Sequence, residues 1–182
     1  MARVTYATRD SMTPEGQKIW DEIETSRGGV ARNYAALLNN PKAAAGLAAL
    51  GGYARFDTPL DARIKTLAIL AAAREAGGHY VWTVNQRGAK EVGLSDDIIA
   101  AILEFRAPAG LPANDAPVVQ FVIELLRHHR VSDPTYQALK AQIGDDGIVD
   151  VLVVSGYYHT LAHCLQALEV DLPEGVTTAL TY

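Results

Sequence analysis

Proline follows a helix-capping residue at four places in this chain, and this pattern constrains the fold more than any other feature. A proline at the first helical position loses no hydrogen bond, and the side chain before it can accept one from a free amide of the first turn. The four pairs are Thr13-Pro14, Asn40-Pro41, Thr58-Pro59 and Asp133-Pro134. Two more candidate caps carry acidic groups at the positive end of a helix dipole. These are Ser95-Asp96-Asp97 and Asn114-Asp115. The sequence therefore predicts a chain built from many helices.

The apolar residues between these starts recur at helical spacing. Leu60, Ile64, Leu67 and Ala71 share one helix face. The stretch IVDVLVVSGYYHT is as rich in β-branched residues as a strand, but its helical pattern continues for about five turns, beyond a normal strand length. We predict an all-α helical bundle that forms a single domain over residues 1–182. The expected helices span 14–26, 41–55, 59–76, 79–92, 96–104, 114–130, 134–142 and 146–168, with a short turn near 31–38.

Composition excludes several classes of protein. A formal net charge of −5 and a pI near 5.5 argue against a nucleic-acid partner, which would require a basic face. No uninterrupted apolar run approaches the roughly 18 residues of a membrane span, and the N-terminus lacks the apolar region of a signal peptide. The single cysteine, Cys164, permits no intrachain disulfide. We expect a cytoplasmic protein without a nucleic-acid partner, a membrane partner or a cofactor.

Two long segments resemble the carboxymuconolactone decarboxylase family, which includes the alkylhydroperoxidase AhpD. The first runs from NYAALLNNP to DDIIAAI, and the second is GYYHTLAHCLQALEVDLPEGV. The resemblance extends over about residues 27–176. It implies an all-helical protomer that assembles into a homotrimer or homohexamer, with sites near helix ends and subunit contacts.

The resemblance allows the peroxidase residues of the family to be checked position by position. That branch uses a glutamate, a Cys-x-x-Cys pair and a histidine four residues beyond the second cysteine. The corresponding positions here are Thr66, Gly78, Val81 and Asn85. Peroxide reduction requires an attacking thiolate and a second thiol, which Cys164 alone cannot supply. A thiol peroxidase is therefore excluded.

The decarboxylase branch commonly has Y-E-W-x-x-H where this chain has Y-V-W-T-V-N. Tyr80 and Trp82 match that pattern, whereas Val81 and Asn85 replace the glutamate and the histidine. Decarboxylation leaves an enolate-like centre that must be protonated, and asparagine cannot cycle a proton. We interpret the segment as an active-site scaffold without its proton carriers, in which Tyr80, Trp82 and Asn85 shape and hydrogen-bond the substrate.

A histidine pair near the C-terminus is the candidate replacement. His159 and His163 are four residues apart, so they share a helix face, and Tyr157 and Tyr158 precede them as candidate substrate contacts. The pair can act in acid–base chemistry, or it can pack between subunits. A metal site would need a third ligand such as His79, and the sequence HTLAH lacks the acid of an HExxH motif. We expect an acid–base role and no metal.

Three further residues are candidate substrate ligands. His79 follows two glycines at a helix N-terminus, where free amides favour an anion, although it can instead serve as a cap. The resemblance places the helices of Arg55 and Arg63 beside the pocket, where a guanidinium can hold a carboxylate through two hydrogen bonds. Both arginines can equally be structural.

These observations predict a lyase, of the decarboxylase type, that acts on a small, oxygenated and carboxylated ring or lactone. Tyr80, Asn85, His159 and His163 are the expected catalytic residues. The alternative is a non-catalytic oligomer of the same fold that binds a small molecule or a partner.

Overall fold

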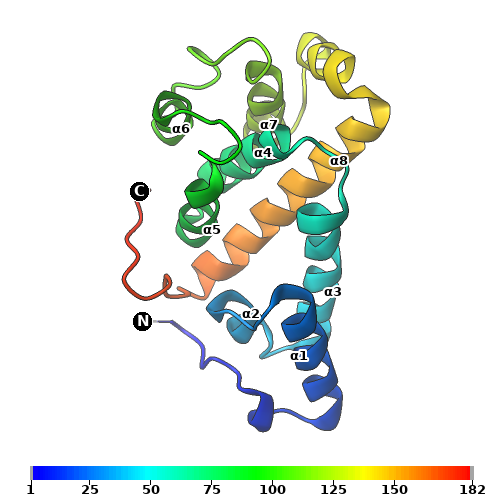
Figure 1. The fold of residues 1–182 in the computed structure, drawn as a ribbon, viewed down its shortest axis with the longest axis vertical. Coiled ribbons are helices and arrows are strands. Elements are labelled where there is room, and N and C mark those ends of the chain that lie inside the picture. Colours follow the sequence, from blue (N-terminus) through cyan, green and yellow to red (C-terminus); the bar gives the residue numbers. More distant parts are fainter. Residues whose placement is uncertain (1, 181–182) are drawn as a thin grey trace.

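A computed structural model describes residues 2–180 of the chain, and Figure 1 shows their arrangement. The α-helices are α1 (Pro14–Arg27), α2 (Arg32–Leu37), α3 (Pro41–Gly52), α4 (Ala62–Glu75), α5 (His79–Asn85), α6 (Asp96–Leu103), α7 (Ala116–His128) and α8 (Asp133–Ala167). Three short turns of other helix types are η1 (Arg9–Ser11), η2 (Tyr53–Asp57) and η3 (Gln86–Gly88). These described residues contain no strand, so the all-α prediction is confirmed.

Three of the six predicted caps are confirmed, whereas the predicted cap at Asp133 is wrong, because α8 begins at that residue and its N-cap position, Ser132, makes no side-chain cap hydrogen bond. The side chains of Thr13, Asn40 and Ser95 accept hydrogen bonds from first-turn amides of α1, α3 and α6. The prediction at Thr58 is wrong, because α4 begins at Ala62 and the Asp61 carboxylate accepts from two amides of its first turn.

The predicted cap at Asn114-Asp115 is also wrong in its chemistry. Asp115 precedes α7 but makes no side-chain cap hydrogen bond. Its carboxylate accepts instead from Nε and Nη2 of Arg63, at 2.8 and 2.6 Å. A buried carboxylate gains more from a paired guanidinium than from one amide.

The predicted helix over 79–92 is too long, because it ends at Asn85 and continues only as the η3 turn. The two helices predicted over 134–142 and 146–168 are confirmed as the two parts of α8, which meet at a kink where Gly144 has a non-helical φ of 70° and ψ of −178°. Glycine suits this position because it adopts a positive φ without a steric penalty.

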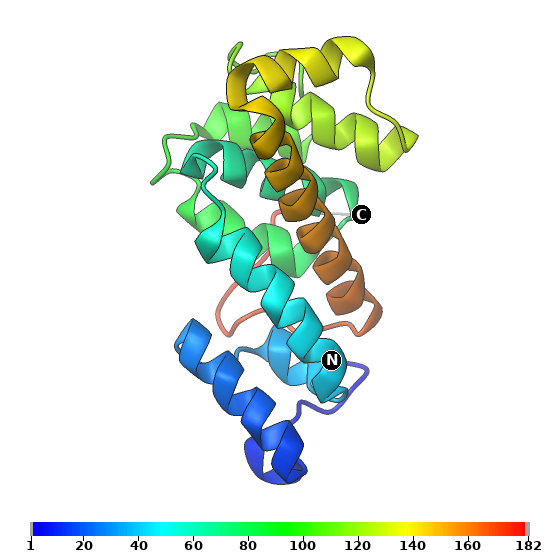
Figure 2. The same ribbon diagram turned by 90° about the vertical axis from the view of Figure 1, so that its right-hand side faces the viewer.

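The helix α8 crosses the whole molecule (Figure 1). Helices α4, α5 and α7 lie against one part of it, α6 packs on α4, α3 lies alongside α8, and α1 and α2 lie at the opposite end (Figures 1 and 2). The main core joins α4, α5, α7 and α8, and a second apolar cluster joins α1, α2 and α3. The boundary between these two clusters positions the site described below.

The hydropathy of α8 departs from the sequence expectation. By length and composition alone, this helix could span a membrane. However, 56% of its most apolar stretch is buried inside the protein, as in a core helix.

Candidate functional site

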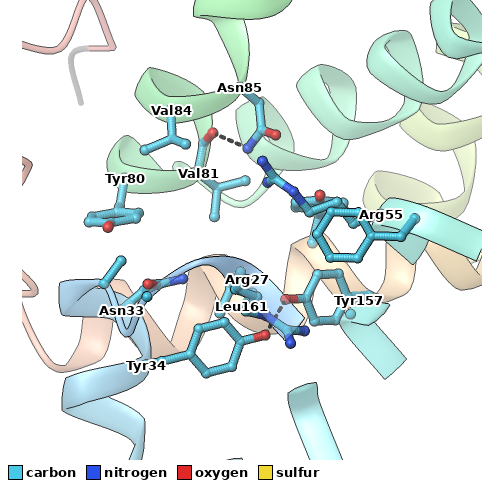
Figure 3. Close-up of a pocket in the computed structure, with 15 residues that line it drawn as sticks. Arg27, Asn33, Tyr34, Arg55, Tyr80, Val81, Val84, Asn85, Tyr157 and Leu161 are labelled. Carbon is cyan, nitrogen blue, oxygen red and sulfur yellow. Dashed lines mark hydrogen bonds between the residues drawn. The ribbon is translucent and has the colours of Figure 1, made fainter. Parts of the chain in front are cut away.

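A cavity of about 290 Å³ lies where α2, η2, α5 and α8 meet (Figure 3). This volume is at the lower end of the range typical of small-molecule sites. Val81, Val84 and Leu161 form an apolar part of its wall, and polar side chains from the other elements form the rest. The cavity can therefore hold one small ligand with both apolar and polar groups.

The close approach of α3 to α8 shapes one wall. A Cβ atom at Gly51 would lie 2.5 Å from Cζ of Tyr157, so only glycine leaves room for this phenol against α3. The Tyr157 and Tyr158 rings meet edge to face, with centroids 4.9 Å apart. Both rings are buried and line the cavity.

The charged groups of the wall are all positive. Arg27 and Arg55 line the cavity, and none of its described lining residues is Asp, Glu, Lys, His or Cys. The Arg27 guanidinium lies 4.7 Å from the centroid of the Tyr34 ring and donates to the carbonyl of Ala48 at 2.7 Å. Arg55 is exposed at the rim beside Phe56. The cavity is thus suited to an anionic ligand.

Tyrosines supply the hydroxyl groups of the wall. The hydroxyls of Tyr34 and Tyr157 are 3.1 Å apart, and either can be the donor. Burial raises the pKa of Tyr157, and the neighbouring Tyr34 raises it further. Burial also raises the pKa of Tyr80 and of Tyr158, and the charge of Arg55 offsets part of this rise for Tyr158. These phenols stay protonated at neutral pH.

Two asparagines also face the cavity. The Asn85 amide donates to the Val81 carbonyl at 2.7 Å, which fixes its side chain against its own helix (Figure 3). The Asn33 side-chain oxygen is buried and has no hydrogen-bond partner within the described chain. Both amides therefore retain hydrogen-bonding capacity for a ligand.

The histidine pair lies on another side of α8. His159 and His163 do form a pair, with ring centroids 4.2 Å apart, but neither lines the cavity. At about 100° per residue, they project from the helix face opposite Tyr157 and Leu161. Burial lowers the pKa of His159, the charge of His163 lowers it further, and Glu75 has the opposite effect. A single site that unites these histidines with Tyr80 and Asn85 is not formed within one protomer.

Three other predicted ligands lie away from the cavity. Trp82 is fully buried in the core and donates from Nε1 to the Gln86 side chain at 2.9 Å. Arg63 binds Asp115 and backbone carbonyls at the end of the α5–α6 connection. His79 does not line the cavity, and burial and the charge of Arg74 lower its pKa. The structure thus brings together Tyr80, Asn85, Tyr157, Tyr158 and Arg55 of the predicted set.

Sequence reasoning missed Arg27, Asn33 and Tyr34. Asn33 and Tyr34 directly precede the apolar run AALL, and that contrast was the available signal. Within residues 2–180, no three side chains of His, Cys, Asp or Glu lie together in a way that could hold a metal ion.

Solved structures of similar fold come from several proteins. An uncharacterised peroxidase-related protein with an AhpD core from Ralstonia eutropha JMP134 has a TM-score of 0.78 at 11% identity, with 95% of this chain and 93% of that one covered. The debrominase Bmp8 in complex with 2,3,4-tribromopyrrole has a TM-score of 0.73 at 12% identity, with 96% and 95% covered. A putative antioxidant defence protein AhpD from Agrobacterium tumefaciens has a TM-score of 0.65 at 19% identity, with 74% and 93% covered.

At these identities the likeness shows the fold. No curated protein matches the sequence significantly. The sequence pattern of the carboxymuconolactone decarboxylase family, however, matches residues 41–116, which run from the start of α3 to the start of α7 and include all of α4 and α5. Residues 41–116 therefore match the carboxymuconolactone decarboxylase family, and the described chain shares the fold of AhpD-like proteins.

Proposed function

We propose that this protein is a lyase of the decarboxylase type that binds a small, oxygenated and carboxylated ring or lactone in the cavity of Figure 3. The observation that carries the proposal is the charge of the wall, with two arginines and no acidic side chain among its described lining residues. Guanidinium groups bind carboxylates through paired, charge-assisted hydrogen bonds. Arg27 and Arg55 are therefore the proposed ligands of the substrate's anionic group.

The family and a fold neighbour support this class of substrate. The family takes its name from a decarboxylase, and the debrominase Bmp8 has been solved with a small substituted ring, 2,3,4-tribromopyrrole. A cavity of about 290 Å³ accommodates a single ring with its substituents. Tyr80 and Asn85, on α5, keep their proposed role of shaping and hydrogen-bonding that ring.

The position of the carboxylate that leaves as CO2 follows from the negative charge that it loses during the reaction. A guanidinium bound to the leaving carboxylate would stabilise the substrate more than a transition state in which that charge is dispersing. The leaving group therefore belongs against the apolar wall of Val81, Val84 and Leu161. The arginines hold an acidic group that remains on the product.

The histidine pair fits a different role from the one expected. The exposed apolar residues Val149 and Leu152 lie on the same side of α8 as His159 and His163. We propose that this face, which we call the outer α8 face, packs against another copy in a homotrimer or homohexamer. At a site formed between two copies, the histidine pair can still act as an acid and a base.

A second candidate function is a non-catalytic small-molecule-binding oligomer. It is favoured by one observation, namely that no described side chain lining the cavity has an ordinary pKa near neutrality. Its ligand would have the same chemistry, since the same arginines would bind it.

A binding and turnover experiment distinguishes these functions. Aromatic and lactone carboxylates are screened by ligand-observed NMR, and those that bind are tested for release of CO2. Arg27→Gln and Arg55→Gln should each weaken binding about 10-fold or more, the loss expected for a charge-assisted hydrogen bond. Arg87→Gln removes an exposed arginine outside the cavity and serves as the matched control. Binding that is insensitive to both cavity arginines would refute the proposed site, whereas binding without CO2 release would favour the second function.

A further inference from the structure

The Tyr34–Tyr157 pair is a feature of the cavity that the family resemblance does not account for. The two phenols come from α2 and α8 and meet across the cavity wall with their oxygens 3.1 Å apart (Figure 3). Each hydroxyl has one hydrogen, so the bond between them uses one hydrogen and leaves the other for a third group. Both side chains line the cavity, so that third group can belong to a ligand.

The surroundings of this pair suit a negatively charged oxygen. The Arg27 guanidinium lies against the Tyr34 ring, 4.7 Å from its centroid, and contributes positive charge. Both tyrosines are buried, with 4% and 5% of their surface exposed. Burial raises the pKa of Tyr157, so this phenol stays neutral and able to donate. Neutral donors fixed in a site of low dielectric constant are what stabilises an enolate oxygen in enzymes.

We propose that the Tyr34–Tyr157 pair binds the enolate oxygen that forms on the ring during the reaction, and that the substrate accordingly carries a ring oxygen conjugated with the bond that breaks. This inference rests on the proposed function, because it assigns a role within the same cavity. It assigns the stabilisation of the intermediate to two phenols, a role different from the acid–base role expected of the histidine pair.

The step is balanced without a cofactor. The bond between the ring and the leaving carboxylate breaks, the carboxylate departs as CO2, and the bonding electron pair moves through the ring onto the conjugated oxygen. The free hydroxyl hydrogen of the pair donates to this oxygen. A proton that ultimately comes from solvent then adds to the ring carbon. One carboxylate and one proton give CO2 and the decarboxylated ring.

A matched pair of probes tests the inference directly. 4-Hydroxy-3-nitrobenzoate carries a carboxylate for the arginines and a phenolate that imitates the enolate, whereas 3-nitrobenzoate lacks the hydroxyl. Absorbance titrations near neutral pH report the phenolate, and calorimetry reports both probes. The wild-type protein should bind the hydroxylated probe at least about 10-fold more tightly and lower its phenol pKa, since hydrogen bonds to a charged group give this gain.

Two variants separate the phenol pair from the arginines. Tyr34→Phe and Tyr157→Phe should each reduce binding of 4-hydroxy-3-nitrobenzoate roughly 10- to 100-fold and leave binding of 3-nitrobenzoate within about twofold. Tyr136→Phe is the matched control, because Tyr136 packs against Phe121 outside the cavity. Circular dichroism melts confirm that each variant is folded, and Tyr34→Phe carries the test should Tyr157→Phe disturb the packing at Gly51.

The outcomes distinguish this inference from the proposed function. Tight binding of both probes without a preference for the hydroxylated one, or an equal loss of both in Tyr34→Phe, would overturn the phenol pair and leave the arginine site intact. Binding of neither probe to the wild-type protein would overturn the proposed function and this inference together.

Discussion

The contact between Gly78 and Ala162 leaves no room for a side chain at a position where the resemblance to the peroxidase branch implies a cysteine. Gly78 caps α5 with φ −78° and ψ 84°, a conformation that other residues can adopt, so backbone strain is not the reason for glycine. A Cβ atom built on Gly78 would lie 2.5 Å from the Ala162 Cβ and 3.5 Å from the Ala73 carbonyl oxygen. A side chain at this position would therefore have to force α5 away from α8.

This geometry predicts the energetics of a double-mutant cycle. Gly78→Ala should destabilise the protein by about 1–3 kcal/mol, the usual cost of overpacking a core. Ala162→Gly should cost about 1 kcal/mol through helix propensity. Together they should cost at least about 1 kcal/mol less than the sum, because the second change removes the atom that the first one meets. Urea unfolding of the four proteins measures the coupling, and Gly46→Ala, which meets no atom within 4 Å, is the matched control.

Additive effects in this cycle would refute the steric argument. A neutral or stabilising Gly78→Ala would do so as well, because it would show that α5 can move at no cost. The control should instead gain about 0.5–1 kcal/mol, since alanine is favoured over glycine inside a helix.

The remaining predictions concern stability and assembly. Burial favours a higher pKa for Glu124, but hydrogen bonds from Gln120, Ser132 and Thr135 prevail and lower it to about 2. The folded-state pKa lies below the unfolded value of 4.5, so the carboxylate stabilises the protein above about pH 4.5 and loses this effect as the pH falls towards 2. Glu124→Gln should therefore cost about 1–2 kcal/mol in urea unfolding at pH 7, after solvent screening, and less at pH 3. Asp115→Asn should cost about 3 kcal/mol in the same assay, because it leaves the Arg63 guanidinium without its partner. Light scattering should show a trimer or hexamer, and Leu152→Asp on the outer α8 face should shift it towards the monomer.

The helical fold could be predicted because its signals are local. Capping side chains at Thr13, Asn40 and Ser95 act within one turn, and the apolar period repeats along each helix. The failure at Thr58 is also local in origin, since Asp61 offers a competing cap three residues later. The cap prediction at Asp115 failed for a different reason. Its partner Arg63 is 52 residues away in the sequence, and spacing along the chain carries no information about that distance.

Residues of the site could be predicted only where a single helix carried the sequence signal for them. The α5 motif led to Tyr80 and Asn85, and the tyrosines of α8 were found beside the histidines. The spacing of residues along α8 places the histidines on one face but does not reveal which face turns towards the cavity, since each residue is rotated by about 100° from the one before it. Arg27, Asn33 and Tyr34 required the tertiary structure, because their helices reach the cavity by packing against α3.

Val81, where the resemblance to the decarboxylase branch implies a glutamate, bears on the positive charge of the cavity. This side chain lines the same cavity as Arg55 and is 2% exposed. A glutamate there, as in the decarboxylase pattern, would place a buried carboxylate among the cavity arginines, where it would demand a guanidinium partner. That internal ion pair would compete with any anionic ligand. With valine in its place, the positive charge of Arg27 and Arg55 is left for the proposed anionic ligand. Under the proposed function, Val81 therefore offers no proton to transfer and leaves both arginine charges to an anion bound beside the phenols.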